Sequence, residues 1–207
     1  TTFFVVGWKF MLPLFIYAIL SWLNDNLGKY YLVLNDISLS TIGGYIGVSG
    51  LVLKVIFTLS AGFDYLVTER LFKKKVNYKA IKQLFLAFFA FGGVAIIGLY
   101  LFAELGVRLF LNENYMSSVH LVLPLGISAL LIKYIHLIES FFIRLGTTSF
   151  ILMGYSLLMT TYFAIVLISN EITPELMCYS QLISCVLTAI FVTVALIITK
   201  RKRGWSS

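Results

Sequence analysis

The sequence has few charged residues, few prolines and few cysteines. Asp, Glu, Lys and Arg make up 12% of the 207 residues, whereas 60% are hydrophobic, and the mean hydropathy is +0.96. A soluble domain usually contains about 25% charged residues, so this composition excludes one. Three prolines exclude a proline-rich linker or a collagen-like repeat, and two cysteines are too few for a disulfide framework. The composition predicts an integral membrane protein.

The sequence also lacks the motifs of familiar enzyme classes. It contains no Gly-x-Ser-x-Gly, no Walker loop and no His-Glu-x-x-His. His120 and His136 lie 16 residues apart without a cysteine or carboxylate at a metal-binding spacing, and Cys178 and Cys185 fit a small, buried apolar role. We therefore expect a protein that is not an enzyme, with no catalytic residues, no cofactor and no metal site.

The start of the chain carries no recognisable signal peptide. The sequence opens Thr-Thr-Phe-Phe, without an initiator Met and without a basic segment followed by a cleavage site. We expect the 207 residues to be a piece of a longer protein.

Six stretches are apolar and long enough to cross a bilayer as a helix, which takes about 20 residues. Lys54 interrupts the second stretch and Lys133 the fourth, and each stretch is treated as one long helix with a charge inside it. Ser38 and the run Thr173-Pro174-Glu175 are typical of helix starts. The sequence predicts a single all-α unit over residues 1–207, a polytopic membrane helical bundle with six transmembrane helices. The expected helices are 8–34, 40–68, 78–102, 117–144, 148–169 and 173–199.

Positive charge is divided unevenly between the two sides of this six-helix arrangement. One side would hold 12 Lys and Arg residues, and the other only Lys29 and Arg108. Because loops rich in Lys and Arg stay in the cytoplasm, we expect both termini to be cytoplasmic. The net charge of +7 thus indicates orientation, and no nucleic-acid partner is expected. The 12 basic residues are Lys9, Arg70, Lys73, Lys74, Lys75, Lys79, Lys82, Arg144, Lys200, Arg201, Lys202 and Arg203.

Lys54 lies near the middle of the second predicted helix, too far from either end for its amine to reach a headgroup layer. In one interpretation its helix face packs closely on another helix, and Asp25 of the first helix neutralises Lys54. In the other, the face lines a cavity and Lys54 attracts an anionic substrate. Both hold if the substrate displaces Asp25. The small residues that share this face are Gly43, Gly47, Gly50, Thr58 and Ala61.

The fourth predicted helix carries a second polar stripe, in which Lys133, His136 and Arg144 follow one another at helical spacing with Glu139 beside them. Snorkelling to the cytoplasmic surface accounts for Arg144 and fits His136. Lys133 is deeper, so either it faces a cavity or it pairs with Glu139 or with another helix. Pro124 and Gly126 predict a kink earlier in the same helix.

The order of segments along the chain follows that of a known transporter family. Trp22-Leu23-Asn24-Asp25-Asn26 ends a long first helix, and Ser40-Thr41-Ile42-Gly43-Gly44-Tyr45 opens a second, which ends in Glu69-Arg70-Leu71-Phe72-Lys73. An amphipathic segment over 104–114, a bent fourth helix and the turn Arg144-Leu145-Gly146-Thr147 follow. In these features, over nearly all 207 residues, the chain resembles the bacterial polysaccharide transporter family. That family includes the O-antigen flippases and belongs to the multidrug/oligosaccharidyl-lipid/polysaccharide exporter superfamily.

The resemblance implies the second six-helix lobe of a transporter whose two lobes surround a central cavity. Such transporters move lipid-pyrophosphate-linked oligosaccharides across the bacterial cytoplasmic (inner) membrane by alternating access, without ATP hydrolysis. It implies as partners the lipid-linked oligosaccharide, membrane lipids and an N-terminal lobe that this chain lacks. Lys54 and Lys133 would attract the pyrophosphate, Asp25 and Glu139 would balance them in the empty site, and His136 would lie with them in the cavity.

One position departs from the family pattern, in which a basic residue often follows the aspartate. Here Asn26 follows Asp25, which favours a more distant partner such as Lys54. Two other functions stay open. A drug or cation exporter of the same superfamily would prefer acidic cavity residues, so Lys54 and Lys133 argue against it. A non-transporting membrane scaffold would require every buried charge to be paired within the structure.

The charge distribution makes a testable prediction about topology. In a variant without other cysteines, single cysteines at Asn112 and Ser169 should react with a membrane-impermeant maleimide added outside intact cells, because both lie on the side poor in Lys and Arg. A cysteine at Asn77, on the Lys- and Arg-rich side, should react only after the cells are permeabilised. Labelling of Asn77 from outside would overturn this orientation.

Overall fold

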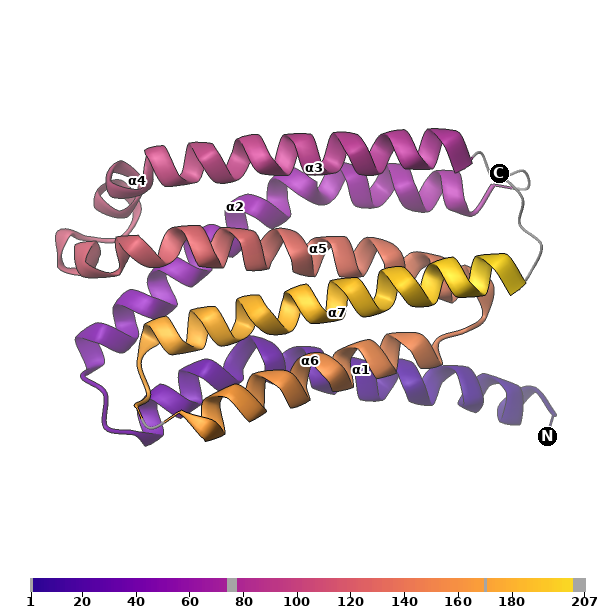
Figure 1. The fold of residues 1–207 in the computed structure, drawn as a ribbon, viewed down its shortest axis with the longest axis horizontal. Helices are drawn as coiled ribbons and strands as arrows, with labels where there is room; N and C mark the ends of the chain where they lie inside the picture. Colours follow the sequence, from indigo (N-terminus) through magenta and orange to yellow (C-terminus); the bar gives the residue numbers. More distant parts are fainter. Residues whose placement is uncertain (1, 74–77, 170, 203–207) are drawn as a thin grey trace.

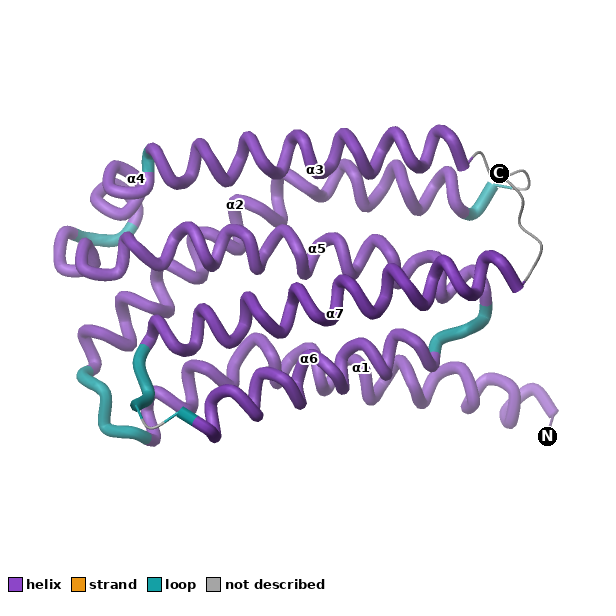
Figure 2. The backbone as a smooth tube through the Cα atoms, in the orientation of Figure 1, coloured by secondary structure: helices purple, strands orange, loops and turns teal. Residues whose placement is uncertain are grey.

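The computed structural model describes residues 2–73, 78–169 and 171–202, which contain seven α-helices, one 3-10 helix and no strand (Figures 1 and 2). Five helical segments in these residues are long and apolar enough to cross a membrane: Leu39–Leu71, Lys79–Leu101, Glu113–Leu145, Ser149–Ile168 and Pro174–Thr199. The elements are α1 (Thr2–Leu34), α2 (Leu39–Leu71), α3 (Tyr78–Leu101), α4 (Ala103–Phe110), η1 (Glu113–Leu121), α5 (Val122–Leu145), α6 (Ser149–Ile168) and α7 (Pro174–Lys202).

The expected helical class is therefore confirmed, and each expected span lies on an observed helix. That α1 forms a sixth membrane span stays a prediction. The sequence analysis treated η1 as the beginning of the fourth span and did not identify α4 as a separate helix. Four residues used for the topology, Lys74, Lys75, Asn77 and Arg203, lie outside the described residues.

Local sequence signals set several helix ends. The Ser38 hydroxyl accepts a hydrogen bond from the backbone N–H of Thr41 at 3.3 Å, and the Thr173 hydroxyl accepts one from Leu176 at 3.2 Å. Both are N-caps at the positions where the sequence predicts helix starts. α5 ends at Gly146, whose φ of 64° lies in the left-handed region that glycine adopts without strain.

The fourth expected span, 117–144, begins differently from the prediction. Its first residues form the 3-10 helix η1, and Pro124 falls in the first turn of α5. A proline in the first turn removes no intrahelical hydrogen bond, because the first N–H groups of a helix have no partner there. This span thus changes from 3-10 to α geometry before the proline, and the kink expected at Pro124 and Gly126 stays a prediction.

α5 is the central helix of the bundle. It packs against α2 and α7, and also against α3, and 15 of its 24 residues are buried. α1 packs mainly on α6, at the edge of the bundle, and makes less contact with α2. Figure 1 shows α2 running obliquely across the other helices in its first half and beside α3 in its second. α1 begins and α7 ends at the same end of the bundle.

Glycines allow the closest approaches between these helices. A Cβ added at Gly126 would lie 3.6 Å from Ile96 of α3, and one at Gly154 would lie 3.1 Å from Val192 of α7. At Gly44 of α2 an added Cβ would collide with the hydroxyl of Ser118, which is buried in η1. By contrast, a Cβ at Gly50 meets no atom within 4 Å.

These two glycines of α2 make a matched pair for mutation. Gly44→Ala should destabilise the protein by about 1–3 kcal/mol, because the methyl group displaces Ser118 from a packed contact. Gly50→Ala should leave stability unchanged or raise it by up to about 1 kcal/mol, because alanine favours the helix and the site is open. The midpoint of thermal unfolding in detergent measures both. Equal midpoints for the two variants would contradict the packing of η1 on α2.

Candidate functional site

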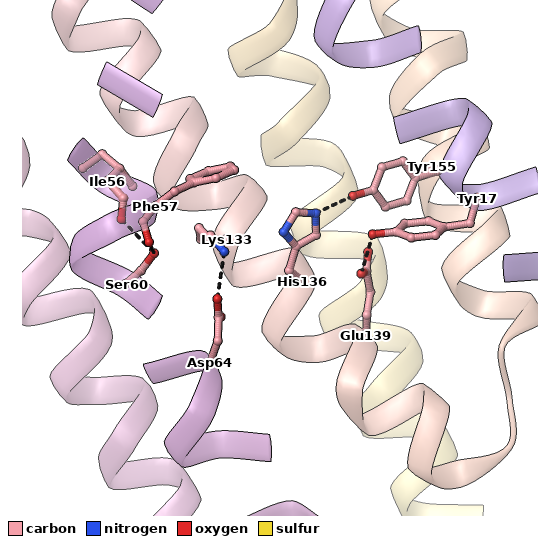
Figure 3. Close-up of polar contacts among 9 residues, drawn as sticks. All are labelled: Tyr17, Ile56, Phe57, Ser60, Asp64, Lys133, His136, Glu139 and Tyr155. Carbon is pink, nitrogen blue, oxygen red and sulfur yellow. Dashed lines mark hydrogen bonds and ion pairs between the residues drawn. The ribbon is translucent and has the colours of Figure 1, made fainter. Parts of the chain in front are cut away.

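Charged and polar side chains meet around the middle of α5 (Figure 3). Lys133 of α5 forms an ion pair with Asp64 of α2, with 2.8 Å between Nζ and Oδ2, and its ammonium lies 4.5 Å from the centre of the Phe57 ring. The Lys133 side chain is only 13% exposed, whereas that of Asp64 is 37% exposed. A lysine at this depth is thus balanced by a carboxylate and an aromatic face of the same neighbouring helix.

The same face of α5 continues into hydrogen bonds with α6 and α1. His136 Nε2 lies 2.8 Å from the hydroxyl of Tyr155, and the hydroxyl of Tyr17 donates to Glu139 Oε2 at 3.1 Å. The rings of Tyr17 and Tyr155 meet edge to face with their centres 4.7 Å apart. Figure 3 shows these contacts forming a row from Asp64 to Tyr17, so that α5 carries polar contacts to three other helices.

One alternative expected for Lys133 is confirmed, whereas the snorkelling expected of His136 is not observed. Lys133 pairs with another helix, as one alternative held, but the partner is Asp64 and not Glu139. Glu139 is 7% exposed and is bound by Tyr17 instead. His136 is partly buried and bonded to Tyr155, so it does not snorkel to the surface. The sequence analysis missed Asp64, Tyr17 and Tyr155. Asp64 could have been found, because it is an acidic residue within an apolar run.

Lys54 is in a different situation from Lys133. It is exposed on α2, and it forms no ion pair with any residue that the structure describes. The expected pair with Asp25 is therefore absent there: Asp25, exposed on α1, instead accepts a hydrogen bond from Asn24 at 3.5 Å. Equal depth in two adjacent helices did not bring the two charges together, because Lys54 lies on the exposed side of α2.

The small-residue face of α2 divides into a packed part and an open part. An added Cβ at Gly43 would lie 3.3 Å from Tyr115, and one at Gly47 would lie 3.3 Å from Leu111. The outer glycines thus pack closely, as expected, and their neighbours are Leu111, which follows α4, and Tyr115 of η1. The rest of the face is exposed, and we call it the Lys54 face; its residues are Gly50, Lys54, Thr58 and Ala61.

A small polar cavity lies between α1, α2 and the core of the bundle. It measures about 20 Å³, which is room for one water molecule. Asp25 borders it from α1, Ser49 from α2 and Gln181 from α7. Asp25 of α1 therefore has a polar neighbour on α2, Ser49, which directly precedes Gly50 of the Lys54 face.

This arrangement fits electrostatic binding better than covalent chemistry. One lysine is neutralised inside the bundle, and another is exposed with its charge unbalanced by any described residue. The described residues contain no group of three or more His, Cys, Asp or Glu side chains that could hold a metal ion. Cys178 and Cys185 are buried and free, in keeping with a packing role.

Comparison with known proteins adds no relative. No family model matches the chain, and no curated protein and no solved structure matches it.

The Lys133–Asp64 pair predicts a strong coupling between two single substitutions. Lys133→Met should destabilise the protein by about 1–3 kcal/mol, because it leaves the Asp64 carboxylate without its cation. The loss should be smaller than for breaking a fully buried ion pair, because Asp64 is partly exposed. Asp64→Leu in the same chain should restore most of the loss, because it removes the stranded charge. Thermal unfolding of the two single variants and the double variant in detergent measures the coupling.

The matched comparison is Lys54→Met, which removes a lysine of similar depth that has no partner among the described residues. Its unfolding midpoint should stay near that of the parent protein. Additive losses for Lys133→Met and Asp64→Leu would show that the ion pair contributes nothing to folding.

Proposed function

We propose that this chain is one lobe of a membrane transporter, a flippase, and that the Lys54 face is part of the wall of its central cavity. The transported molecule is a lipid-pyrophosphate-linked oligosaccharide of the kind used to build bacterial surface polysaccharides. The observation that carries the proposal is the exposed ammonium of Lys54 in the middle of α2, with no ion pair among the described residues.

The position of Lys54 makes its exposure costly in a membrane. It lies 15 residues from Leu39 and 17 from Leu71, the two ends of α2, or about 22 Å and 26 Å along the helix at 1.5 Å per residue. A lysine side chain spans much less than that, so snorkelling does not solve the problem. A charge at the bilayer centre costs at least about 3 kcal/mol when it faces lipid. The Lys54 face therefore needs water or another protein surface over it.

The side chains around Lys54 suit a water-filled cavity that receives an anion. Gly50, Thr58 and Ala61 are small and leave room above the helix, and Gly50 has no atom within 4 Å of an added Cβ. A pyrophosphate would find there a cation that is not already neutralised. Lys133 and Asp64, in contrast, balance each other, so we assign them to holding α2 against α5 and leave substrate attraction to Lys54.

The resemblance to the polysaccharide transporter family supports the identity of the substrate. The observed helices follow the expected order, and α4 overlaps the amphipathic segment expected over 104–114. A scaffold in which every charge is paired is disfavoured by Lys54 and Asp25, which are both exposed and form no ion pair with each other. In an exporter of organic cations, the unbalanced positive charge of Lys54 would repel the substrate.

The proposal predicts that transport and folding respond differently to the two lysines. In the complete transporter, Lys54→Ala should lower polysaccharide export by about tenfold or more, the loss expected for one charged contact of about 1.5–3 kcal/mol. Lys54→Glu should lose more, and Lys54→Arg should keep part of the activity, because the charge remains while its geometry changes. Cell-surface polysaccharide is measured in cells that depend on the variant gene, with folded protein in the membrane quantified in parallel.

Lys82→Ala, which removes an exposed lysine near the start of α3, is the matched control and should export normally. Lys133→Ala should reduce folded protein and export together. Normal export by well-folded Lys54→Ala protein would sink the assignment of Lys54 to the substrate.

The proposal also predicts that the 207 residues alone do not flip lipids. One lobe supplies only one wall of a cavity, and the Lys54 face would meet lipid on the other side. Reconstitution into liposomes with a fluorescent lipid-linked oligosaccharide tests this. Flipping by a monomer of this chain would refute the lobe interpretation, whereas flipping only at protein densities that favour dimers would support a need for two walls.

A further inference from the structure

A large cleft lies at the end of the bundle that carries α4. It has a volume of about 860 Å³. The end of α3, the helix α4, the end of η1 and the starts of α5 and α7 form its walls. It is separate from the polar row of Figure 3, and no residue of the Lys54 face borders it.

α4 has the character of a helix that lies in a membrane surface. Its Ala103 and Val107 are buried against the bundle, whereas Leu105, Leu109 and Phe110 are between 53% and 73% exposed. Large exposed apolar side chains on a short amphipathic helix at the end of a membrane bundle insert at the level of the lipid headgroups. The cleft beside α4 therefore opens where phospholipid headgroups lie.

The cleft presents one cation and one anion that are free to bind a ligand. Arg108 and Glu104 both line it, are both exposed and lie one turn apart on α4, yet they form no ion pair within the described residues. His120, at the far wall, is already bonded to Glu175 at 2.7 Å. The rings of Tyr100 and Tyr179 border the same space and add aromatic faces.

We propose that this cleft binds the headgroup of a zwitterionic phospholipid, with its phosphate on Arg108 and its ammonium on Glu104. Side chains one turn apart on a helix have Cβ atoms about 5–6 Å apart, which suits the short two-carbon link between phosphate and ammonium in an ethanolamine headgroup. A guanidinium matches a phosphate, and aromatic faces such as Tyr100 and Tyr179 favour a nearby ammonium. Glu104 disfavours a headgroup with net negative charge.

An apolar groove next to the cleft gives room for an acyl chain of the same lipid. It has a volume of about 390 Å³, runs between α2, α3 and α4, and shares Ala103 and Leu105 with the cleft. Its floor includes Gly98, where an added Cβ would meet no atom within 4 Å. Every residue that lines the groove is apolar or glycine, so an acyl chain can occupy it without burying a polar side chain.

Lipid retention tests the proposal directly. The full 207-residue chain is placed in nanodiscs with equal amounts of phosphatidylethanolamine and phosphatidylglycerol, transferred to a mild detergent, and examined by native mass spectrometry. Phosphatidylethanolamine should be retained in preference to phosphatidylglycerol. Arg108→Gln should lower its retention by about fivefold, the factor expected for one surface cation. Glu104→Gln should lower it as well and abolish the preference over phosphatidylglycerol.

Two further measurements separate the contribution of the lipid headgroup from that of the acyl chain. Gly98→Leu, which places a side chain in the groove at a position where an added Cβ meets no atom within 4 Å, should lower retention while leaving Arg108 and Glu104 intact. Soluble glycerophosphoethanolamine should compete poorly, because it has no chain. Lys82→Gln, near the opposite end of α3, is the control and should retain lipid normally.

Equal retention of the two lipids by the parent chain, or unchanged retention by Arg108→Gln, would overturn the proposal. Competition by glycerophosphoethanolamine as effective as that of the lipid would refute the role of the groove. The substituted side chains on α4 are exposed, so the variants should keep the parent unfolding midpoint. A lower midpoint together with lost retention would contradict the placement of Arg108 and Glu104 on an exposed face.

Discussion

The bilayer offers no water to an ionised side chain, and this constraint governs how the helices are arranged around α5. Lys133 is largely buried on the central helix, and it is accommodated because α2 brings Asp64 to 2.8 Å and a phenyl ring to 4.5 Å. The contact holds α2 against α5. Val52, Ile56 and Ser60 of α2 are buried in the bundle, and Lys54, on the opposite side of the helix, is exposed.

The two lysines therefore show two solutions to the same electrostatic problem. For Lys133 the solution lies within the chain, and its effect is structural: it holds α2 against α5. For Lys54 the solution lies outside the chain, in water, in an anion or in another protein surface. A protein that needed only stability would have no reason to keep an unbalanced cation in the middle of a span. This contrast supports transport more than the number of polar residues in the spans does.

Helix positions could be predicted closely from the sequence, because apolar length, charged boundaries and capping residues such as Ser38 and Thr173 act over a few residues. Partners could not. Asp64 lies 69 residues from Lys133 along the chain, and which faces of two helices meet depends on packing that periodicity alone does not contain. The expected pair of Lys54 with Asp25 failed for this reason: the position of each residue along its helix could be estimated, but the rotation of each helix was not known. The 3-10 geometry of η1 could not be predicted either, because η1 packs on Gly43 and Gly44 of α2, which are far from it in the sequence.

The placement of the first and last helices at one end of the bundle has a consequence for how such a protein can grow in evolution. A unit that enters and leaves on the same side can be duplicated in tandem with a short connector, and both copies then insert with the same orientation. The copies would be related by an axis along the membrane normal, the symmetry of parallel-repeat carriers. Their Lys54 faces could meet across that axis, so that one gene duplication would convert an exposed charge into the lining of a shared aqueous vestibule.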